Sequence, residues 1–202
     1  MEDAKRSDMK AMPAKPRKRL SPDARRRQLR DVAMKAFAAA GIERAVHADV
    51  AALAGVSTPT VFKYFPTRDA LVDDVLDRVE VTITDLITQI PVQSQLSVAD
   101  MLYRFASGLD VLCLTEPDLM KVALAWSVAF SSVRERYITF QEQQLDMLQA
   151  RLGQSEHDRS DARILMGVAL LYTRMHFDGT SDDVRRRYVD RLTELWAASP
   201  DG

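Results

Sequence analysis

The sequence has 202 residues, of which 47% are hydrophobic and 28% are charged, and its net charge is −1. This length and apolar content suffice for one large domain, or two small ones, with a buried core. Because no uninterrupted apolar run of about 18 residues occurs, we expect no membrane span. The use of a single cysteine suits a reducing compartment, so a cytoplasmic location is expected. The single cysteine, Cys113, excludes an internal disulfide framework and is expected to be buried.

The near-neutral net charge hides a basic N-terminal segment. Residues 1–30 contain eleven Lys and Arg against four Asp and Glu, whereas the rest of the chain contains seventeen against twenty-five. A basic arm on an acidic body is typical of a protein that holds a polyanion at one end. Residues 1–20, rich in charge, Ala and Pro, are predicted to be disordered in the free protein and to form this arm.

A long helix and a short one are predicted after the arm. Ser21 and Pro22 are typical of a helix start, and apolar residues then recur with helical spacing until Gly41 ends the helix. A second helix is predicted over 46–54. Its residues expected to face inward are Val50, Leu53 and Ala54.

Two further helices follow a glycine turn. Gly55 is expected in a left-handed conformation, and Ser57 is expected to cap a third helix that extends over 57–65. Thr67 then caps a fourth helix that reaches Pro91. The residues expected to face inward from the third helix are Val61 and Phe65.

The remainder of the chain keeps a helical pattern, and no segment shows the sustained alternation that predicts a strand. The fold class is therefore all-α, with about nine helices. The helices expected after Pro91 lie near 97–114, 118–132, 134–152, 160–177 and 182–198.

Two short helices joined at Gly55 form the pattern of a helix-turn-helix. In that device the second helix enters the major groove and turns its first residues toward the bases. The hydroxyls, the lysine and the tyrosine of the helix over 57–65 suit phosphate and base-edge contacts. The start of the fourth helix, beside Arg68, offers a further anion site. Double-stranded DNA is therefore the predicted partner.

These features resemble the TetR family of bacterial transcription regulators over about residues 20–80, through "AGVS", "TVFKYF" and "TRDALV". More narrowly, "RLSP" and "TVFKYFPTR" are similar to the LuxR/HapR-type branch, whose members are quorum-sensing master regulators. Lys63 stands where that branch usually has Asn, which predicts a different base preference. The resemblance and the anion site together assign DNA contacts to Arg17, Arg19, Ser57, Thr58, Thr60, Phe62, Lys63, Tyr64, Thr67 and Arg68.

The last two predicted helices carry apolar stripes of the kind found at subunit interfaces. A homodimer is expected, because two recognition helices one DNA turn apart read a near-palindrome. The candidate interface residues are Ile164, Gly167, Leu171, Val184, Tyr188, Leu192 and Leu195.

The resemblance also implies a cavity between the fourth helix and the helices that follow it. Met and aromatic side chains there suit an adaptable pocket for a small apolar ligand. The expected polar contacts are Gln141 and the indole N–H of Trp126. The candidate lining residues are Ile83, Leu86, Met101, Phe105, Trp126, Phe130, Phe140, Gln141 and Leu145.

Four functions remain open, of which a repressor released by such a ligand is the first. The second is a ligand-independent global regulator controlled by its own abundance, and the third is a helical adaptor that binds only protein. An enzyme is disfavoured because the three histidines are far apart and no catalytic, metal-binding or phosphate-loop motif occurs, so we expect no cofactor, metal or catalytic residue. The expected domains are a basic arm (1–20), a DNA-binding domain (21–67) and a regulatory and dimerisation domain (68–202).

Overall fold

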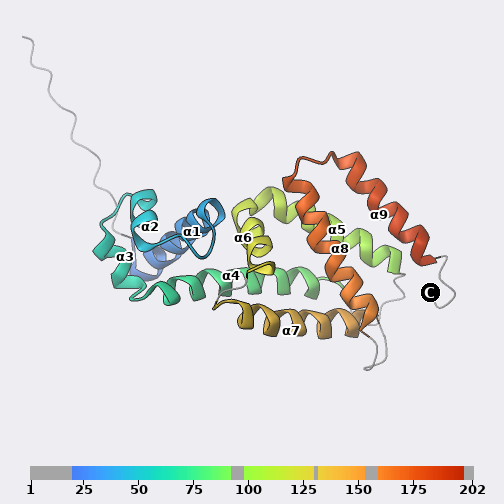
Figure 1. The fold of residues 1–202 in the computed structure, drawn as a ribbon, viewed down its shortest axis with the longest axis horizontal. Helices are drawn as coiled ribbons and strands as arrows, with labels where there is room; N and C mark the ends of the chain where they lie inside the picture. Colours follow the sequence, from blue (N-terminus) through green and yellow to red (C-terminus); the bar gives the residue numbers. More distant parts are fainter. Residues whose placement is uncertain (1–19, 92–97, 130–131, 153–158, 198–202) are drawn as a thin grey trace, which may run out of the picture.

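The computed structural model describes residues 20–91, 98–129, 132–152 and 159–197. Over these ranges the chain forms nine helices and no strand, which confirms the predicted all-α class. A small helical unit lies at one end and the remaining helices extend away from it (Figure 1). The helices are α1 (Pro22–Ala40), α2 (His47–Ala54), α3 (Thr58–Tyr64), α4 (Arg68–Thr88), α5 (Val98–Thr115), α6 (Pro117–Ser127), α7 (Arg134–Leu152), α8 (Ser160–Phe177) and α9 (Asp182–Ala197).

The starts of α1 and α4 and the end of α2 are fixed by the capping residues that the sequence indicates. The Ser21 hydroxyl accepts a hydrogen bond from the Ala24 N–H at 3.2 Å, and the Thr67 hydroxyl accepts one from the Ala70 N–H at 3.0 Å. Gly55 ends α2 with φ 64° and ψ 38°, the left-handed conformation that side chains with a Cβ resist. These observations confirm the predicted starts of α1 and α4 and the turn between α2 and α3.

The small unit formed by α1, α2 and α3 closes around its own apolar residues. Phe37 of α1, Val50 of α2 and Val61 of α3 are fully buried in it. The prediction that Leu53 faces inward is wrong, because its side chain is 60% exposed. The buried residues of α2 are instead His47, Val50 and Ala51. Their spacing of three and four positions places them on one face of the helix.

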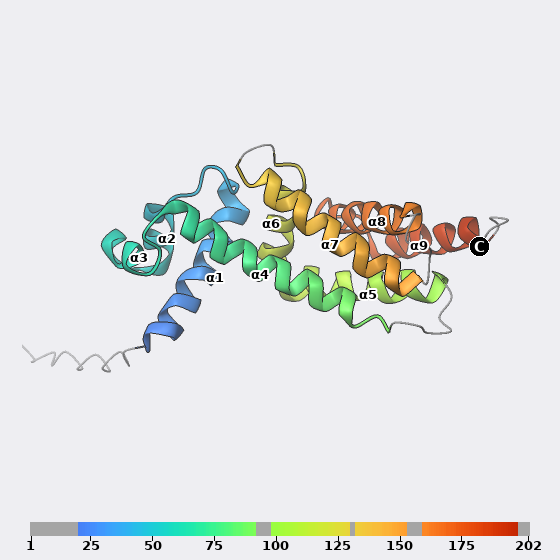
Figure 2. The same ribbon diagram turned by 90° about the horizontal axis from the view of Figure 1, so that it is seen from below.

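Helix α4 leaves this unit and runs through the rest of the molecule. It contacts α1 at one end and α5, α6 and α7 beyond, and it lies alongside α7 in both views (Figure 2). The far end is built from α5, α8 and α9, whereas α6 packs against α1. The position of α4 therefore joins the small unit mechanically to the larger bundle. None of the helices in the described ranges is long and apolar enough to span a membrane.

Helix α6 ends at Ser127, five residues before the predicted limit of 132. The chain turns there because side chains bond across the turn. The Trp126 indole N–H donates to the Val133 carbonyl at 3.0 Å, and Arg134 donates to the Ser127 carbonyl at 3.2 Å. Hydrogen bonds between side chains and backbone of this kind satisfy groups that a continued helix would have paired internally.

Candidate DNA-binding surface and internal cavity

The outward face of α3 borders an open hollow on the surface of the small unit. Hydroxyl and basic groups meet there, as at a surface that accepts phosphates and base edges. Ser57 precedes the first residue of α3 as predicted, but its hydroxyl pairs with the Thr60 hydroxyl at 2.8 Å instead of capping the backbone. The lining residues are Arg25, Val56, Ser57, Pro59, Thr60, Lys63 and Tyr64.

The remaining residues predicted to contact DNA differ in solvent exposure and in their hydrogen bonds within the protein. Thr58 is half-buried, and Thr67 is exposed although its hydroxyl caps α4. Arg68 donates one hydrogen bond to the Ile42 carbonyl, so part of its guanidinium is engaged within the protein. Arg17 and Arg19 lie outside the described residues. None of these positions is known to touch DNA, and their role stays a prediction.

Phe62 projects from α3 beside a histidine that sequence reasoning did not place in the site. The Phe62 side chain is 47% exposed, and its ring stacks on the buried His47 ring with centroids 4.1 Å apart and planes 9° apart. The Nε2 atom of His47 lies 2.8 Å from the Phe65 carbonyl oxygen. Because a carbonyl only accepts, Nε2 carries the proton of this bond. His47 therefore contacts both the Phe62 ring and the C-terminal end of α3.

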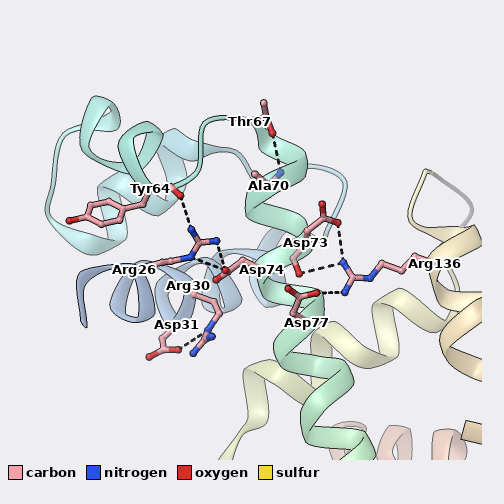
Figure 3. Close-up of polar contacts among 10 residues, drawn as sticks. All are labelled: Arg26, Arg30, Asp31, Tyr64, Thr67, Ala70, Asp73, Asp74, Asp77 and Arg136. Atoms are coloured by element: carbon pink, nitrogen blue, oxygen red, sulfur yellow. Dashed lines mark hydrogen bonds and ion pairs between the residues drawn. The ribbon is translucent and has the colours of Figure 1, made fainter. Parts of the chain in front are cut away.

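A second clamp on the end of α3 comes from Arg26 of α1. One Arg26 nitrogen donates to the Tyr64 carbonyl at 3.3 Å, and the guanidinium lies 4.8 Å from the centre of the Phe65 ring. Figure 3 shows that the Tyr64 ring projects away from this contact and away from α4. The sequence gives only a run of three arginines here, which does not indicate which of them faces inward.

The same arginine begins a row of ion pairs along α4. Arg26 reaches Asp74 at 2.6 Å, and Arg136 of α7 reaches Asp73 at 3.0 Å and Asp77 at 2.6 Å (Figure 3). Arg136 also reaches Glu80 at 2.8 Å. Burial alone would lower the pKa of Arg136, but hydrogen bonds to the carboxylates outweigh it and the net shift is upward. Helix α4 is thus held from α1 on one side and from α7 on another.

An internal cavity of about 90 Å³ lies among α4, α5, α6, α7 and α8. The Trp126 ring lines it and contacts two rings of α7, Tyr137 edge-on and Phe140 stacked, each with centroids 5.4 Å apart. Burial raises the pKa of Tyr137. The predicted lining residues that border the cavity are Ile83, Leu86, Phe105, Trp126, Phe140 and Gln141.

The observed cavity differs from the predicted pocket in its lining residues and in the role of the Trp126 N–H. Met101 and Leu145 are buried in the core but do not line the cavity, and Phe130 lies outside the described residues. The Trp126 indole N–H was expected to meet a ligand, yet it already donates to the Val133 carbonyl. Sequence reasoning missed Gln144, which lines the cavity one helical turn from Phe140.

The residues predicted at a dimer interface lie on the outer surface of α8 and α9. Ile164, Leu171, Val184 and Leu195 are exposed apolar side chains, and a Cβ on Gly167 would meet no atom within 4 Å. Tyr188 and Leu192 are partly buried against the core. The two helices therefore present apolar side chains to the outside, as surfaces that bind another protein do.

Nothing in the described ranges gathers three or more histidine, cysteine or acidic residues in a way that could hold a metal ion.

Residues 29–75 match the sequence profile of the family described as "Bacterial regulatory proteins, tetR family". Residues 29–75 are a TetR-family domain. This match confirms the resemblance found in the sequence, and the matched family consists of regulatory proteins.

The comparison with characterised proteins adds a partial match. The chain is 52% identical over 71 residues to the "HTH-type transcriptional regulator LuxR" of Vibrio harveyi. The match covers 35% of this chain and 35% of LuxR, so the chain spans about a third of that relative.

Solved structures share the fold over most of the chain. A TetR-like transcriptional regulator from Rhodococcus sp. RHA1 aligns with a TM-score of 0.68 at 20% identity, over 90% of this chain and 100% of that one. The fatty acid degradation regulator FadR of Bacillus halodurans aligns with a TM-score of 0.60 at 16% identity, over 88% and 96%. The multidrug binding protein EbrR, solved with imidazole, aligns with a TM-score of 0.58 at 20% identity, over 85% and 90%. These identities establish a shared fold only.

Proposed function

We propose that this chain is a sequence-specific DNA-binding transcription regulator and that α3 is its recognition helix. The observation that carries the proposal is the exposed face of α3 within a TetR-family domain. That face combines the hydroxyl of Thr60 and the ring of Tyr64 with the cationic Lys63. The major groove admits a helix, and base edges and phosphates are contacted by side chains of these kinds.

The chemistry of α3 suggests how the groove is read. Lys63 would donate to a guanine edge or a phosphate, and the exposed Phe62 ring would contact a thymine methyl group. Thr58 and the start of α4 would bind phosphates, which fix the register on the duplex. Arg17 and Arg19 of the N-terminal arm would enter the adjacent minor groove.

We infer that the regulator acts as a homodimer on a near-palindromic site. The exposed apolar side chains of α8 and α9 support a self-complementary interface formed by these two helices. Such a dimer would place two copies of α3 about 34–36 Å apart, one turn of DNA.

Control by a small apolar ligand is the first candidate for regulation. EbrR, which shares the fold, is described as a multidrug binding protein, and this chain has an apolar cavity beside α4 and α7. A ligand that moved α7 would act on α4 through Arg136 and so change the placement of α3. Ligand and DNA would then weaken each other's binding by the same factor.

Control by the amount of protein is the second candidate, and the size of the cavity favours it. A volume of about 90 Å³ is below the range of roughly 300–1,000 Å³ typical of drug-sized ligand sites. The similarity to LuxR suggests a quorum-sensing role in which abundance sets the response. Ligand control requires reciprocal coupling between ligand and DNA, and abundance control does not.

Selection of binding sites from a random duplex library tests the proposed function without a guessed operator. We expect enrichment of a near-palindrome whose half-sites are about 10 base pairs apart. Lys63→Ala should relax the preferred bases, whereas Lys35→Ala, an exposed lysine of α1 outside the proposed surface, should leave them unchanged. Recovery of no common sequence by the wild-type chain would contradict the proposal and favour the protein-binding adaptor.

A further inference from the structure

The three consecutive arginines at the start of α1 lie in three different surroundings. Arg26 binds the Tyr64 carbonyl and the Asp74 carboxylate (Figure 3). Arg27 is exposed and does not line the hollow beside α3. Arg25 is half-buried and lines that hollow, although it is not among the residues predicted to contact DNA. The structure therefore separates one arginine of the run from the other two by its position on the proposed DNA-binding surface.

The Arg25 guanidinium is held in place and keeps its charge. Its Nη1 atom donates to Oε1 of Gln28, one helical turn further along α1, at 2.7 Å. The Gln28 amide is neutral, and no carboxylate among the described residues forms an ion pair with Arg25. Because a guanidinium has five N–H donors, this contact leaves most of them for another acceptor. A planar fork of N–H groups fits the oxygens of a phosphate in particular.

The place of Arg25 in the fold selects which part of a duplex it would meet. In the proposed complex, the arm before Leu20 enters the minor groove and α3 enters the neighbouring major groove. One sugar-phosphate strand separates two such grooves. Arg25 lies between the arm and α3, because it belongs to the first turn of α1 and shares the wall of the hollow with Lys63. A cation between the two elements faces the strand of phosphates that lies between the two grooves.

We propose that Arg25 binds a phosphate of the DNA backbone at the edge of the groove that α3 enters. The contact would fix the register of α3 on the duplex without reading a base, as phosphate contacts do. This inference rests on the proposed function and adds to it a residue that sequence reasoning missed.

Fluorescence anisotropy of the full chain on its selected duplex, across a salt series, tests the contact. Arg25→Gln should weaken binding by about tenfold or more near 0.1 M salt. The slope of log affinity against log salt should fall by about 0.9, the value for one phosphate contact. Arg25→Lys keeps the charge and should restore the slope, whereas Arg27→Gln, the matched control, should leave it unchanged. An unchanged slope in Arg25→Gln, or equal changes in Arg25→Gln and Arg27→Gln, would overturn the proposal.

Selection from the random duplex library separates a phosphate contact from a base contact. Arg25→Gln should recover the same bases as the wild-type chain, and a changed consensus would overturn the proposal. Arg25→Met, a second neutral variant, should reproduce the loss of slope, and the urea midpoints of both should match that of the wild type. A wild-type chain that selects no sequence would contradict the proposed function and this inference with it. Selection by the wild type with an unchanged slope in both neutral variants would contradict only the role of Arg25.

Discussion

Arg136 of α7 donates to Asp77 of α4 across 2.6 Å, close to the cavity and to the point where α4 meets the DNA-binding unit. Asp77 lies one helical turn beyond Asp73, which Arg136 also contacts, and Asp74 on the same helix is held by Arg26. Asp73, Asp74 and Asp77 of α4 are thus bound by one arginine from α1 and one from α7. This arrangement connects the helical bundle directly to α4, the helix that follows α3.

Removal of the Arg136 guanidinium should destabilise the protein. Its side chain is 26% exposed, less than in most surface ion pairs, and it pairs with three carboxylates. We expect Arg136→Met to lower the free energy of unfolding by about 1–2 kcal/mol in urea titrations. Arg191→Met is the matched control, because Arg191 is 68% exposed and its ion pair among the described residues is with Glu194. Its effect should stay within about 0.5 kcal/mol, and equal losses in both variants would contradict the account of α4.

Loss of the His47 hydrogen bond should weaken the fold of the DNA-binding unit. His47→Phe keeps an aromatic ring against Phe62 but removes the donor to the Phe65 carbonyl. We expect a loss of about 1–3 kcal/mol in thermal or urea unfolding, because a buried carbonyl is left without that partner.

Phe62→Leu provides the contrasting case. The Phe62 ring is half exposed, so its removal should change the free energy of unfolding by less than about 1 kcal/mol. Affinity for the selected duplex should nevertheless fall measurably, since the ring is proposed to contact bases. A Phe62→Leu protein with unchanged duplex affinity would remove this residue from the proposed recognition surface.

Charge on the outer face of α8 should disrupt self-association. Leu171 is 46% exposed and belongs to the predicted interface, and we expect Leu171→Arg to shift the protein from dimer to monomer in sedimentation velocity. Leu114→Arg is the control, because Leu114 is 72% exposed on α5 and outside the predicted set. A wild-type chain that sediments as a monomer, or dissociation caused equally by both variants, would contradict the α8 and α9 interface.

The Cys113 thiol should resist alkylation in the folded protein. Burial raises its pKa from 9.0 to about 11, and the Asp110 carboxylate adds to the shift. Near pH 8 the reactive thiolate should therefore be about 100-fold scarcer than in the unfolded chain. Iodoacetamide labelling followed by mass spectrometry should be slow in buffer and fast in urea. Comparable rates would contradict burial of this thiol.

The same shift has a defined sign for stability. The folded pKa of Cys113 is above the unfolded value, so the neutral thiol favours the folded state below about pH 9. This contribution is lost as pH rises from about 9 to about 11. The Tyr172 phenol, whose pKa burial and Asp110 raise to about 12, acts in the same direction. Stability should therefore decline on the alkaline side as these groups ionise.

The helix ends could be predicted from the sequence because their causes are local. Ser21, Gly55 and Thr67 act on backbone groups within a few residues, and each was found in the expected role. The early end of α6 could not be predicted in this way. It depends on a Trp126 side chain that bonds Val133 across a turn, and apolar periodicity continues past that point.

In the candidate sites, too, local features could be predicted from the sequence and long-range contacts could not. Helix α3 could be predicted because its spacing and residue types recur in a known family. The contacts of Arg136 join residues 56 to 63 positions apart in the chain, and no local pattern indicates such pairs. Leu53 was expected inside because it is apolar. Helix α2 instead packs against α1 and α3 with His47, Val50 and Ala51 buried, and Leu53 is exposed.

Fluorescence anisotropy on DNA tests the central claim most directly. The purified chain would be titrated onto a duplex from upstream of its own gene, or onto the selected site, and onto a scrambled duplex across a salt series. We predict tighter binding to the first duplex, a steep loss of affinity with salt as phosphate contacts release counterions, and loss of the preference when Lys63 and Tyr64 are both replaced by alanine. Failure to bind either duplex even at low salt would contradict the assignment of α3 as a DNA-reading helix.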